Sequence, residues 1–358
     1  MQGFINPEIL HWAITTKGID KELIAKKLNK KIEDLENWLK GKSLPTFKQA
    51  QKLAKILDIP FGYLFLKSPP KENLPIPDFR TIKNKKPVSS NLKQLLLDLE
   101  QKVLFLEDFY KTEGYAKLNY IGIFDFNSNY KEVANFIKKH FLESEKIDLK
   151  ELIENFAKKR IFVFRNGLVG NNTHRKIDVN EIRGAVYVNE YAPIVFINSN
   201  DSEKAQIFTL IHELVHVLIN QSEFSDISFD SNNKIEIFCN KVAAEVLMPT
   251  EKMKKYFIKS KEDLEKISNE LNVSKLAILY RMLNLGKISK KEFEELKCQE
   301  KKEVVNGGNF YFSIKKRYTK EFIKIVKMSV LSEKITYKEG SDLLGVRVNT
   351  LNNIFKRI

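Results

Sequence analysis

The stretch FTLIHELVHVLIN, residues 208–220, limits what this chain can fold into more than any other stretch does. It contains the pattern H-E-x-x-H, formed by His212, Glu213 and His216. On an α-helix, two residues four positions apart lie on one face, separated by about 40° around the axis. Two imidazoles in this arrangement can bind a single tetrahedral cation. The pattern therefore predicts a helix that carries two metal ligands, with Glu213 beside the metal.

The residues around this motif favour a partly buried helix. Asn200 and Glu203 have the spacing of a capping box, which predicts that the helix begins just after Asn200. Apolar residues follow at helical spacing, namely Ile207, Leu210, Ile211, Leu214 and Leu218. This stripe predicts one buried face, with the two histidines at its borders. The alternative is a pair of histidines satisfied inside an ordinary core, although the chain has only 5 histidines.

The composition is that of a folded protein. The 358 residues are 43% hydrophobic and 30% charged, which allows a sizeable core and two or three domains. The first residues lack a signal pattern and no apolar run is long enough to span a bilayer, so we expect a cytoplasmic location and no membrane partner. Cys239 and Cys298 are the only cysteines, which argues against disulfide bonds and against a cysteine zinc knuckle.

An excess of basic residues favours acidic partners. The chain has 61 Lys and Arg against 46 Asp and Glu, a net charge of +15. Such a charge favours DNA or an acidic protein surface. The alternative is a lysine-rich surface with no specific partner.

The N-terminal segment has the pattern of a bundle of short helices. Residues 21–28 and 32–39 are predicted helices joined by a tight turn, which is helix-turn-helix spacing. Residues 25–46 resemble the Xre-type family of DNA-binding domains, whose core and turn positions are matched by Ala25, Leu28, Trp38, Gly41, Lys42 and Pro45. The candidate DNA contacts of this segment are Lys30, Lys31 and Lys42.

The second helix of this pair departs from the family pattern in its charge. Glu33, Asp34 and Glu36 stand where a recognition helix usually offers basic or amide side chains, and carboxylates repel phosphates. DNA binding therefore competes with a second interpretation, in which the segment is a dimerisation or partner-docking module.

A linker and several helices come next. Residues 68–81 contain four prolines, which predicts an extended connector. The apolar periodicity of residues 92–110, 129–141 and 149–159 predicts three helices.

Three strand-like runs precede the metal-binding helix. They are residues 160–165, 184–189 and 193–198, and they predict a small antiparallel sheet. An extended substrate can add itself to the edge of such a sheet, main chain to main chain. Residues 193–198 are the predicted edge strand, although a core strand has the same pattern.

Two histidines leave a zinc ion one protein ligand short. The next helix, which Pro249 helps to end, offers Glu236 and Glu245. Nine residues of helix correspond to roughly 900° of rotation, so the two glutamates face opposite sides and only one can reach the metal. The spacing alone does not choose between them.

The same residues carry a resemblance to a known family. HELVH followed by E-x-x-x-N-x-x-A-A-x-x-L-M-P resembles the signature of the ImmA/IrrE family of zinc metallopeptidases. The runs LPIPDFRT, residues 74–81, and GGNFYFSIKKRY, residues 307–318, also resemble fusions of Xre-type domains to this family. The resemblance implies that Glu236 is the third zinc ligand and that Cys239 is an inert buried residue. Asn240, one turn after Glu236, is a candidate for orienting a ligand, although an asparagine on a helix face needs no such role.

The predicted chemistry is hydrolysis of a peptide bond. Zinc bound by two neutral imidazoles and one carboxylate keeps an open position, at which it activates water. Glu213 is predicted to accept a proton from that water and to pass it to the leaving amine. The residue that stabilises the oxyanion is left open among His174, Tyr187 and Tyr191.

One helix-turn-helix pattern occurs three times. LNKKIEDL (28–35), LNVSKLAI (271–278) and LGVRVNTL (344–351) each place an Asn or Gly, suited to a left-handed turn, directly after a leucine. The second copy is expected to be a structural wall of the catalytic domain.

The third copy lies in a basic segment. Residues 301–358 have 13 basic and 5 acidic residues, an excess of 13 − 5 = 8. Its candidate DNA contacts are Arg347, Asn349 and Thr350. The alternative is a pair of helices that only pack against the rest of the protein.

These patterns predict an α+β, mostly helical protein with a zincin-like catalytic domain. The expected domains are a helix-turn-helix domain (1–67), a proline-rich linker (68–90), a helical connector (91–145), a zinc metallopeptidase domain (146–300) and a basic helical region (301–358). The family resemblance implies an endopeptidase that cleaves a regulatory protein, typically a helix-turn-helix repressor, to relieve repression. The competing hypothesis is a DNA-binding transcription regulator whose metal-binding domain is a sensor or partner module without proteolysis.

Overall fold

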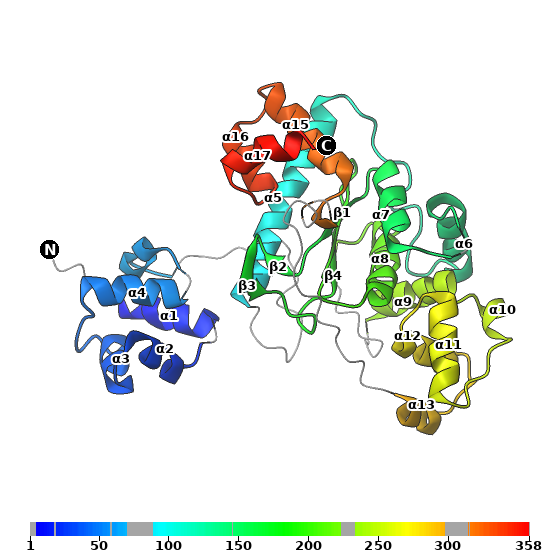
Figure 1. Ribbon diagram of the computed structural model, residues 1–358, viewed down its shortest axis with the longest axis horizontal. Helices are drawn as coiled ribbons and strands as arrows, with labels where there is room; N and C mark the ends of the chain where they lie inside the picture. Colours follow the sequence, from blue (N-terminus) through cyan, green and yellow to red (C-terminus); the bar gives the residue numbers. More distant parts are fainter. Residues whose placement is uncertain are drawn as a thin grey trace. The chain divides into compact units, whose positions relative to one another are not determined.

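The computed structural model describes residues 5–17, 19–57, 59–69, 89–144, 146–222, 233–297, 314 and 316–357. The chain divides into two compact units, Met1–Leu96 and Leu97–Ile358 (Figure 1). The division falls inside helix α5 (Ser90–Thr112). The helix predicted over residues 92–110 is confirmed by α5. No described helix is both long and apolar enough to cross a membrane.

The first unit is a bundle of short helices. It contains α1 (Pro7–Lys17), α2 (Lys21–Leu28), α3 (Ile32–Leu39), α4 (Phe47–Leu57) and the 3-10 helix η1 (Phe61–Phe65). The predicted helices 21–28 and 32–39 are confirmed. Asn29 joins them in the left-handed conformation, with φ of 53°. Leu28, Leu35 and Trp38 lie in the apolar core of the bundle. Residues 70–88, most of the predicted linker, lie outside the described residues.

The second unit contains a three-stranded sheet with the order β1-β5-β4. Strand β5 (Ile194–Ile197) lies between β1 (Phe162–Arg165) and β4 (Gly184–Tyr187). β4 pairs with β5 antiparallel, with Gly184 opposite Ile197, whereas β1 pairs with β5 in parallel. The sheet is therefore mixed rather than antiparallel throughout.

The prediction that residues 193–198 form the edge strand was wrong, because β5 has a neighbour on each side. All four residues of β5 are buried, as expected for a central strand covered on both faces. The apolar run PIVFI had no alternation that could have indicated an exposed edge. A short hairpin of β2 (Leu168–Val169) and β3 (Asn172–Lys176) follows β1 and was not predicted.

Helices pack on this sheet and on one another. The predicted helices 129–141 and 149–159 are confirmed as α6 (Tyr130–Phe141) and α7 (Leu149–Lys158). The predicted metal-binding helix is α8 (Glu203–Leu218), and α9 (Lys234–Leu247) packs closely against both α8 and α6. Figure 1 shows α8 and α9 beside the sheet, in the green part of the chain.

Helix α8 does not begin as predicted. Its N-cap is Ser202, whose hydroxyl accepts a hydrogen bond from the amide of Ala205 at 3.3 Å. The side chain of Asn200 is used elsewhere, because its amide donates to the carbonyl oxygens of Gly167 and Ile177. The capping-box prediction was therefore wrong by two residues.

Further helices follow α9 in the second unit, namely α10 (Thr250–Met253), α11 (Lys261–Leu271), α12 (Lys275–Asn284) and α13 (Lys290–Leu296). The C-terminal part contains α15 (Lys320–Leu331), α16 (Tyr337–Leu343) and α17 (Val348–Phe355). Asn272, with φ of 52°, joins α11 to α12, and Gly345, with φ of 59°, joins α16 to α17. The predicted turn is thus confirmed in all three copies.

The C-terminal helices are anchored to β1 and α5. Tyr318 forms an isolated bridge with Phe164 of β1, and the ring of Phe322 lies 4.8 Å from that of Phe164. Lys102 of α5 is only 1% exposed, and its Nζ lies 2.5 Å from Asp98 Oδ1. Burial lowers the pKa of Lys102, although the carboxylate of Asp98 opposes this shift. α15 to α17 are therefore part of the same compact unit as the sheet.

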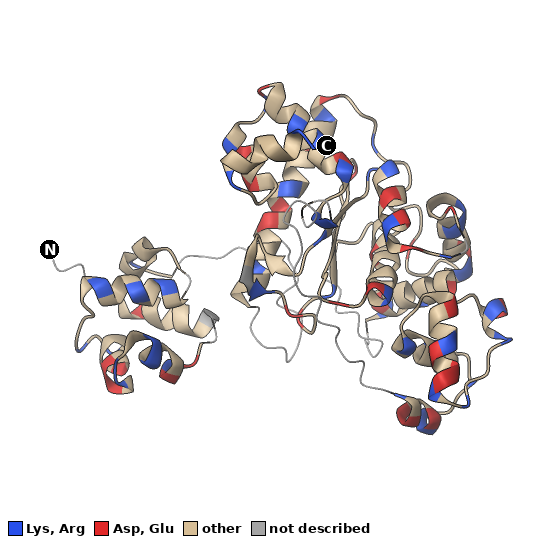
Figure 2. Ribbon diagram, viewed as in Figure 1, with Lys and Arg blue, Asp and Glu red and all other residues tan. Residues whose placement is uncertain are grey.

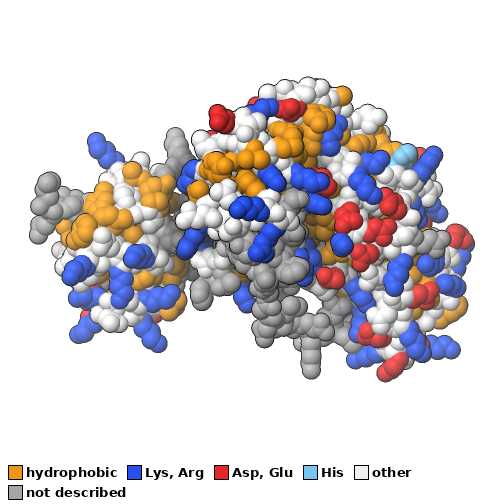
Figure 3. All heavy atoms as spheres, turned by 45° about the horizontal axis from the view of Figure 1, so that its top comes forward, with side chains coloured by type: hydrophobic (Ala, Val, Ile, Leu, Met, Phe, Trp, Pro, Cys, Tyr) orange, Lys and Arg blue, Asp and Glu red, His pale blue; other side chains and the backbone are white. Residues whose placement is uncertain are grey.

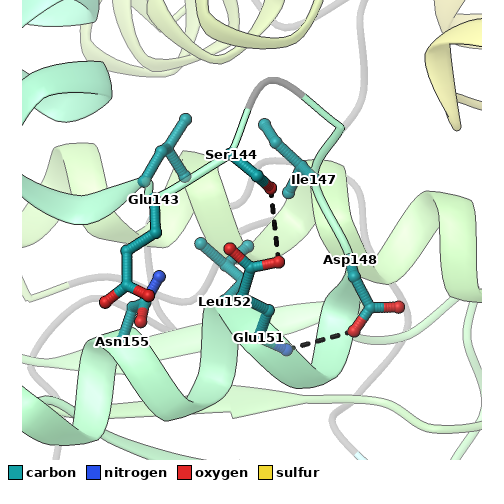
Figure 4. Close-up of a pocket in the computed structure, with 8 residues that line it drawn as sticks. Glu143, Ser144, Ile147, Asp148, Glu151, Leu152 and Asn155 are labelled. Carbon is teal, nitrogen blue, oxygen red and sulfur yellow. Dashed lines mark hydrogen bonds between the residues drawn. The ribbon is translucent and has the colours of Figure 1, made fainter.

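A small cavity of about 10 Å³ lies where α6 leads into α7 (Figure 4). Glu143, Asp148 and Glu151 line it, but Asp148 Oδ1 accepts hydrogen bonds from two amides of α7 and so caps that helix. Ser144 donates to Glu151. These contacts belong to the packing of α6 and α7, and none of the predicted metal ligands lines the cavity.

Candidate metal centre

The structure brings together the predicted ligands from two adjacent helices. His212 and His216 lie one turn apart on α8, and Glu236 lies in the first turn of α9. His212, Glu213 and His216 are 0% exposed and Glu236 is 4% exposed. The centre is thus enclosed in the core that α8 and α9 form with the sheet.

The ligand atoms have the separations of a tetrahedral metal site. The Nε2 atoms of His212 and His216 are 3.2 Å apart. The carboxylate oxygens of Glu236 lie 3.3 Å from His212 Nε2 and 3.1 Å from His216 Nε2. A tetrahedral zinc ion with bonds of about 2.0 to 2.1 Å needs ligand atoms roughly 3.3 Å apart. The donor set of two imidazoles and one carboxylate therefore fits a metal ion.

The carboxylate of Glu236 supports the same conclusion. Among the residues that the structure describes, its two oxygens are buried without a partner in hydrogen-bonding geometry. A buried carboxylate without such partners is costly, whereas coordination of a cation satisfies it.

The other glutamate of α9 has a different role. Glu245 forms an ion pair with the buried guanidinium of Arg281 and accepts hydrogen bonds from the amide and hydroxyl of Thr250. Of the two glutamates between which the helical spacing did not choose, Glu236 lies at the histidines and Glu245 joins α9 to α12.

Asn240 lies one turn after Glu236 and contacts His212. Its Oδ1 is 3.0 Å from His212 Nδ1, so that nitrogen donates to the amide oxygen. The proton is thereby held on Nδ1 and the lone pair of Nε2 points to the metal position. Burial lowers the pKa of His212, which also favours the neutral imidazole that binds metals.

Cys239 lies closer to the two histidines than the sequence predicted. Its sulfur lies within 4.8 Å of imidazole nitrogens of both histidines, although Cys239 was expected only to fill space. The signal was present, because Cys239 follows Glu236 by three residues and so shares its helical face. Burial raises the pKa of the Cys239 thiol. The oxygens of Glu236 lie 3.3 Å and 3.1 Å from the two Nε2 atoms, so Glu236 meets the spacing of ligands around one zinc ion.

Gly184 was also missed. A Cβ at this position of β4 would lie 2.4 Å from Glu213 Oε1 and 2.5 Å from Thr209 Cγ2. Only glycine allows β4 and α8 to approach this closely. The sequence contained no signal for the contact, because the two residues are far apart in the chain.

Two of the candidates for stabilising an oxyanion, Tyr187 and Tyr191, have neighbours on α5. Tyr187 of β4 is buried, and burial, together with the charge of Glu100 on α5, raises the pKa of its phenol. The ring of Tyr191 lies 5.5 Å from Lys111 Nζ, also on α5. The side chain of His174 lies outside the described residues.

The candidate DNA contacts fall on two separate helix pairs. Lys30, Lys31 and Lys42 are exposed around α3, and Lys30 lies 3.9 Å from the carboxylate of Asp34. Arg347, Asn349 and Thr350 lie at the start of α17, where the first two are exposed.

A helix carrying H-E-x-x-H beside a small sheet, with a carboxylate from the following helix, is the arrangement of a zincin-like metallopeptidase domain. Residues 161–283 match the family model Peptidase_M78, described as the IrrE N-terminal-like domain. This match begins just before β1 and ends within α12, so it covers the sheet and both helices of the metal centre. The segment is therefore a metallopeptidase-type domain that supports the ImmA/IrrE resemblance.

No curated protein matches the chain significantly. The family match includes neither the N-terminal helices nor α15 to α17. The Xre-type resemblance of the first unit therefore stays a prediction.

Proposed function

We propose that this protein is a zinc-dependent endopeptidase that cleaves a helix-turn-helix transcriptional repressor and thereby relieves repression. The observation that carries the proposal is the triangle of ligand atoms of His212, His216 and Glu236, with Glu213 on the same helix turn. The family match over the same residues supports the reaction class.

Each residue of the centre has one task in this proposal. His212, His216 and Glu236 would hold the ion, whose contribution when bound would be Lewis-acid polarisation of the scissile carbonyl and of the attacking water. Glu213 accepts a proton from the attacking water at a carboxylate oxygen and delivers it to the nitrogen of the leaving amine. Asn240 keeps the Nδ1 proton of His212 in place.

We assign the substrate strand to β4. β4 pairs with β5 on one side only, and within the described residues no strand pairs with its other side. The close approach of Gly184 to Glu213 puts this strand beside the proposed base. An extended peptide added to the edge of β4 would bring its main chain to the metal centre.

We assign substrate docking to α3. Its outward residues include Glu33 and Glu36, and the DNA-binding surfaces of repressors are basic. An acidic helix therefore complements the surface that a repressor uses to bind DNA. Reversing these charges should raise the KM for the repressor and leave kcat unchanged.

The test uses the full-length protein loaded with zinc and the helix-turn-helix proteins encoded nearest to its gene. We expect the wild type to cleave one of them at a defined peptide bond, identified by mass spectrometry. Glu213→Gln should cleave it at least about 100-fold more slowly, because the proton acceptor is lost. Glu251→Gln, at an exposed position on α10, is the matched control and should cleave normally. Equal survival of every candidate repressor with wild type and Glu213→Gln would refute the proposal.

The position of Cys239 favours a second candidate function. Its sulfur lies within 4.8 Å of the imidazole nitrogens, and a zinc site with four protein ligands is closed and typically structural. In this alternative the metal domain is a sensor in a DNA-binding regulator. A promoter complex that responds to zinc removal, with no cleavage of any candidate repressor, would favour this alternative.

A further inference from the structure

The first and last copies of the helix-turn-helix pattern correspond position by position. Asn29 and Gly345 have φ values of 53° and 59°, and the N-cap residues Lys31 and Arg347 are both extended. The inward positions also correspond, because Leu35 matches Leu351 and Trp38 matches Ile354, all of them buried. The two second helices, α3 and α17, therefore differ mainly in what they present outward.

The outward faces have different chemistry. In α3 the positions at i, i+3, i+4 and i+7 are Glu33, Glu36, Asn37 and Lys40. In α17 the same positions are Asn349, Asn352, Asn353 and Lys356, all four exposed. Two carboxylates in the first copy are thus replaced by two amides in the last copy.

We propose that α17 binds double-stranded DNA, with its outward face in the major groove. The side-chain amides of Asn349 and Asn353 would read base edges, because an asparagine can bond both N6 and N7 of adenine. Arg347 and Lys356, at the two ends of the helix, would contact phosphates. In a helix-turn-helix, the second helix is the one that enters the groove.

The charge around α17 is compatible with phosphates. No acidic residue occurs from Gly345 to the end of the sequence. The acidic residues of α16 are engaged locally, because Glu339 accepts from Thr336 at the N-cap and Asp342 lies 2.5 Å from Lys338 Nζ. Figure 2 shows more blue than red on the C-terminal helices, whereas α3 carries a cluster of red.

The inner face of α17 is already occupied. Leu351, Ile354 and Phe355 are buried against the neighbouring helices of the C-terminal group. Lys327 of α15 donates to the carbonyl oxygen of Phe355 at 2.7 Å, and Asn171 donates to the carbonyl oxygen of Gly345. α17 is thus held from the inside and at both ends, which leaves its polar face directed outward.

Another exposed surface of these helices has a different composition. Met328 and Leu331 of α15 are 57% and 61% exposed. Figure 3 shows hydrophobic and basic side chains close together on the face that it draws. Neither residue is on α17, and nothing described covers them. DNA recognition is therefore assigned to the asparagine face of α17 and not to this apolar area.

The first experiment measures phosphate contacts with the full-length protein and a mixed-sequence DNA duplex. Arg347→Glu combined with Lys356→Glu should weaken binding at least about tenfold and lower the slope of log affinity against log salt by about 2. The matched control reverses the corresponding charges of the first copy, Lys31→Glu with Lys40→Glu, and should change affinity less than about twofold. Equal losses in the two double variants, or a larger loss in the control, would overturn the proposal.

The second experiment tests base reading. Duplexes selected by the wild type from a random pool should share a motif, and Asn349→Ala with Asn353→Ala should bind that motif about tenfold more weakly. The same variant should keep its affinity for mixed-sequence DNA, because its phosphate contacts remain. Unchanged thermal melting confirms that these exposed substitutions leave the fold intact. Tighter binding of single-stranded RNA than of the duplex, or no loss in the asparagine variant, would contradict the proposal.

Discussion

The middle and last copies of the helix-turn-helix pattern show how one local structure serves two purposes. Both copies have a residue in the left-handed conformation between their helices, Asn272 in α11–α12 and Gly345 in α16–α17. The inward positions of their second helices are buried in both. In the middle copy the positions that correspond to Asn349, Asn352 and Asn353 are Leu276, Leu279 and Tyr280. Leu279 is buried, and the ring of Tyr280 lies 4.8 Å from that of Phe293 in α13. The last copy leaves the same face to solvent.

This difference teaches that the turn and the inward face specify only the backbone. The outward residues decide whether the second helix becomes part of a core or a surface for a partner. Arg281 of the middle copy stands where the last copy has Ile354. Its buried guanidinium forms an ion pair with Glu245 and donates a hydrogen bond to the carbonyl oxygen of Met248. α12 is thereby joined to α9, the helix that carries Glu236.

Removal of zinc should produce the largest difference between the middle copy and the first copy, because it should destabilise only the middle one. The metal would bind α8 and α9, which are connected to α12, so a thousandfold excess of zinc over its Kd should stabilise this domain by about 4 kcal/mol. Hydrogen exchange measured with and without a chelator should therefore accelerate in α11 and α12 and stay constant in α2 and α3. Equal acceleration in both copies would show that the metal does not act through α8 and α9.

Truncation of an outward side chain should lower the free energy of unfolding in the middle copy and leave it nearly unchanged in the last copy. Leu279→Ala should lower the free energy of unfolding by about 3 kcal/mol, because it removes a buried side chain. Asn352→Ala, at the corresponding exposed position, should change it by less than about 0.5 kcal/mol. Both values can be measured by chemical denaturation. A large cost at Asn352 would indicate that α17 is covered.

Exchange of the outward residues of α3 for those of α17 should give the first copy the affinity for DNA that we propose for the last copy. Replacing Glu33, Asp34 and Glu36 with Asn, Thr and Asn should raise the affinity for a mixed-sequence DNA duplex by up to about tenfold at low salt, since three carboxylates no longer repel phosphates. Neutralising the exposed carboxylates Glu262, Glu294 and Glu295 is the control. An equal gain in the control would mean that net charge, and not position, determines binding.

The turn residues should give the smallest effects. Gly345→Ala should cost about 1 kcal/mol, because an alanine is strained at a φ of 59°. Its added Cβ would meet only the hydroxyl of Tyr318 at 3.7 Å, an ordinary contact, so no further cost is expected. Asn272→Gly relieves the strain at a φ of 52° but removes the hydrogen bond from the Asn272 amide to the carbonyl oxygen of Ile147, so it should cost up to about 1 kcal/mol. Melting temperatures of the two variants provide the measurement, and a clearly larger loss for Gly345→Ala would imply a second role for that glycine.

The candidate centre was largely predictable because it depends on helical periodicity. The spacing of His212 and His216 places both on one face whatever surrounds the helix. The spacing of Glu236 and Glu245 also showed that only one of them could reach the metal. Which one does so depends on how α9 packs on α8 and on the ion pair of Glu245 with Arg281.

The errors concern contacts between residues far apart in the chain. The run PIVFI identified a strand, but only its pairing with both β1 and β4 makes it central. Asn200 is a residue type that commonly caps helices, but its side-chain amide donates to the carbonyl oxygens of Gly167 and Ile177. Ser202 caps α8 instead. Local patterns cannot distinguish such competing partners.

The sequence by itself determined the predicted helices, the three left-handed turns and the common helix face of His212 and His216, because these follow from spacing along one element. The tertiary structure alone decided the strand order, the ion pair of Glu245 with Arg281 and the approach of Gly184 to Glu213. It also decided that the amide face of α17 stays exposed while the equivalent face of α12 is covered. The physical reason is that burial and close approach depend on which surfaces meet, and that is fixed only when distant parts of the chain pack together.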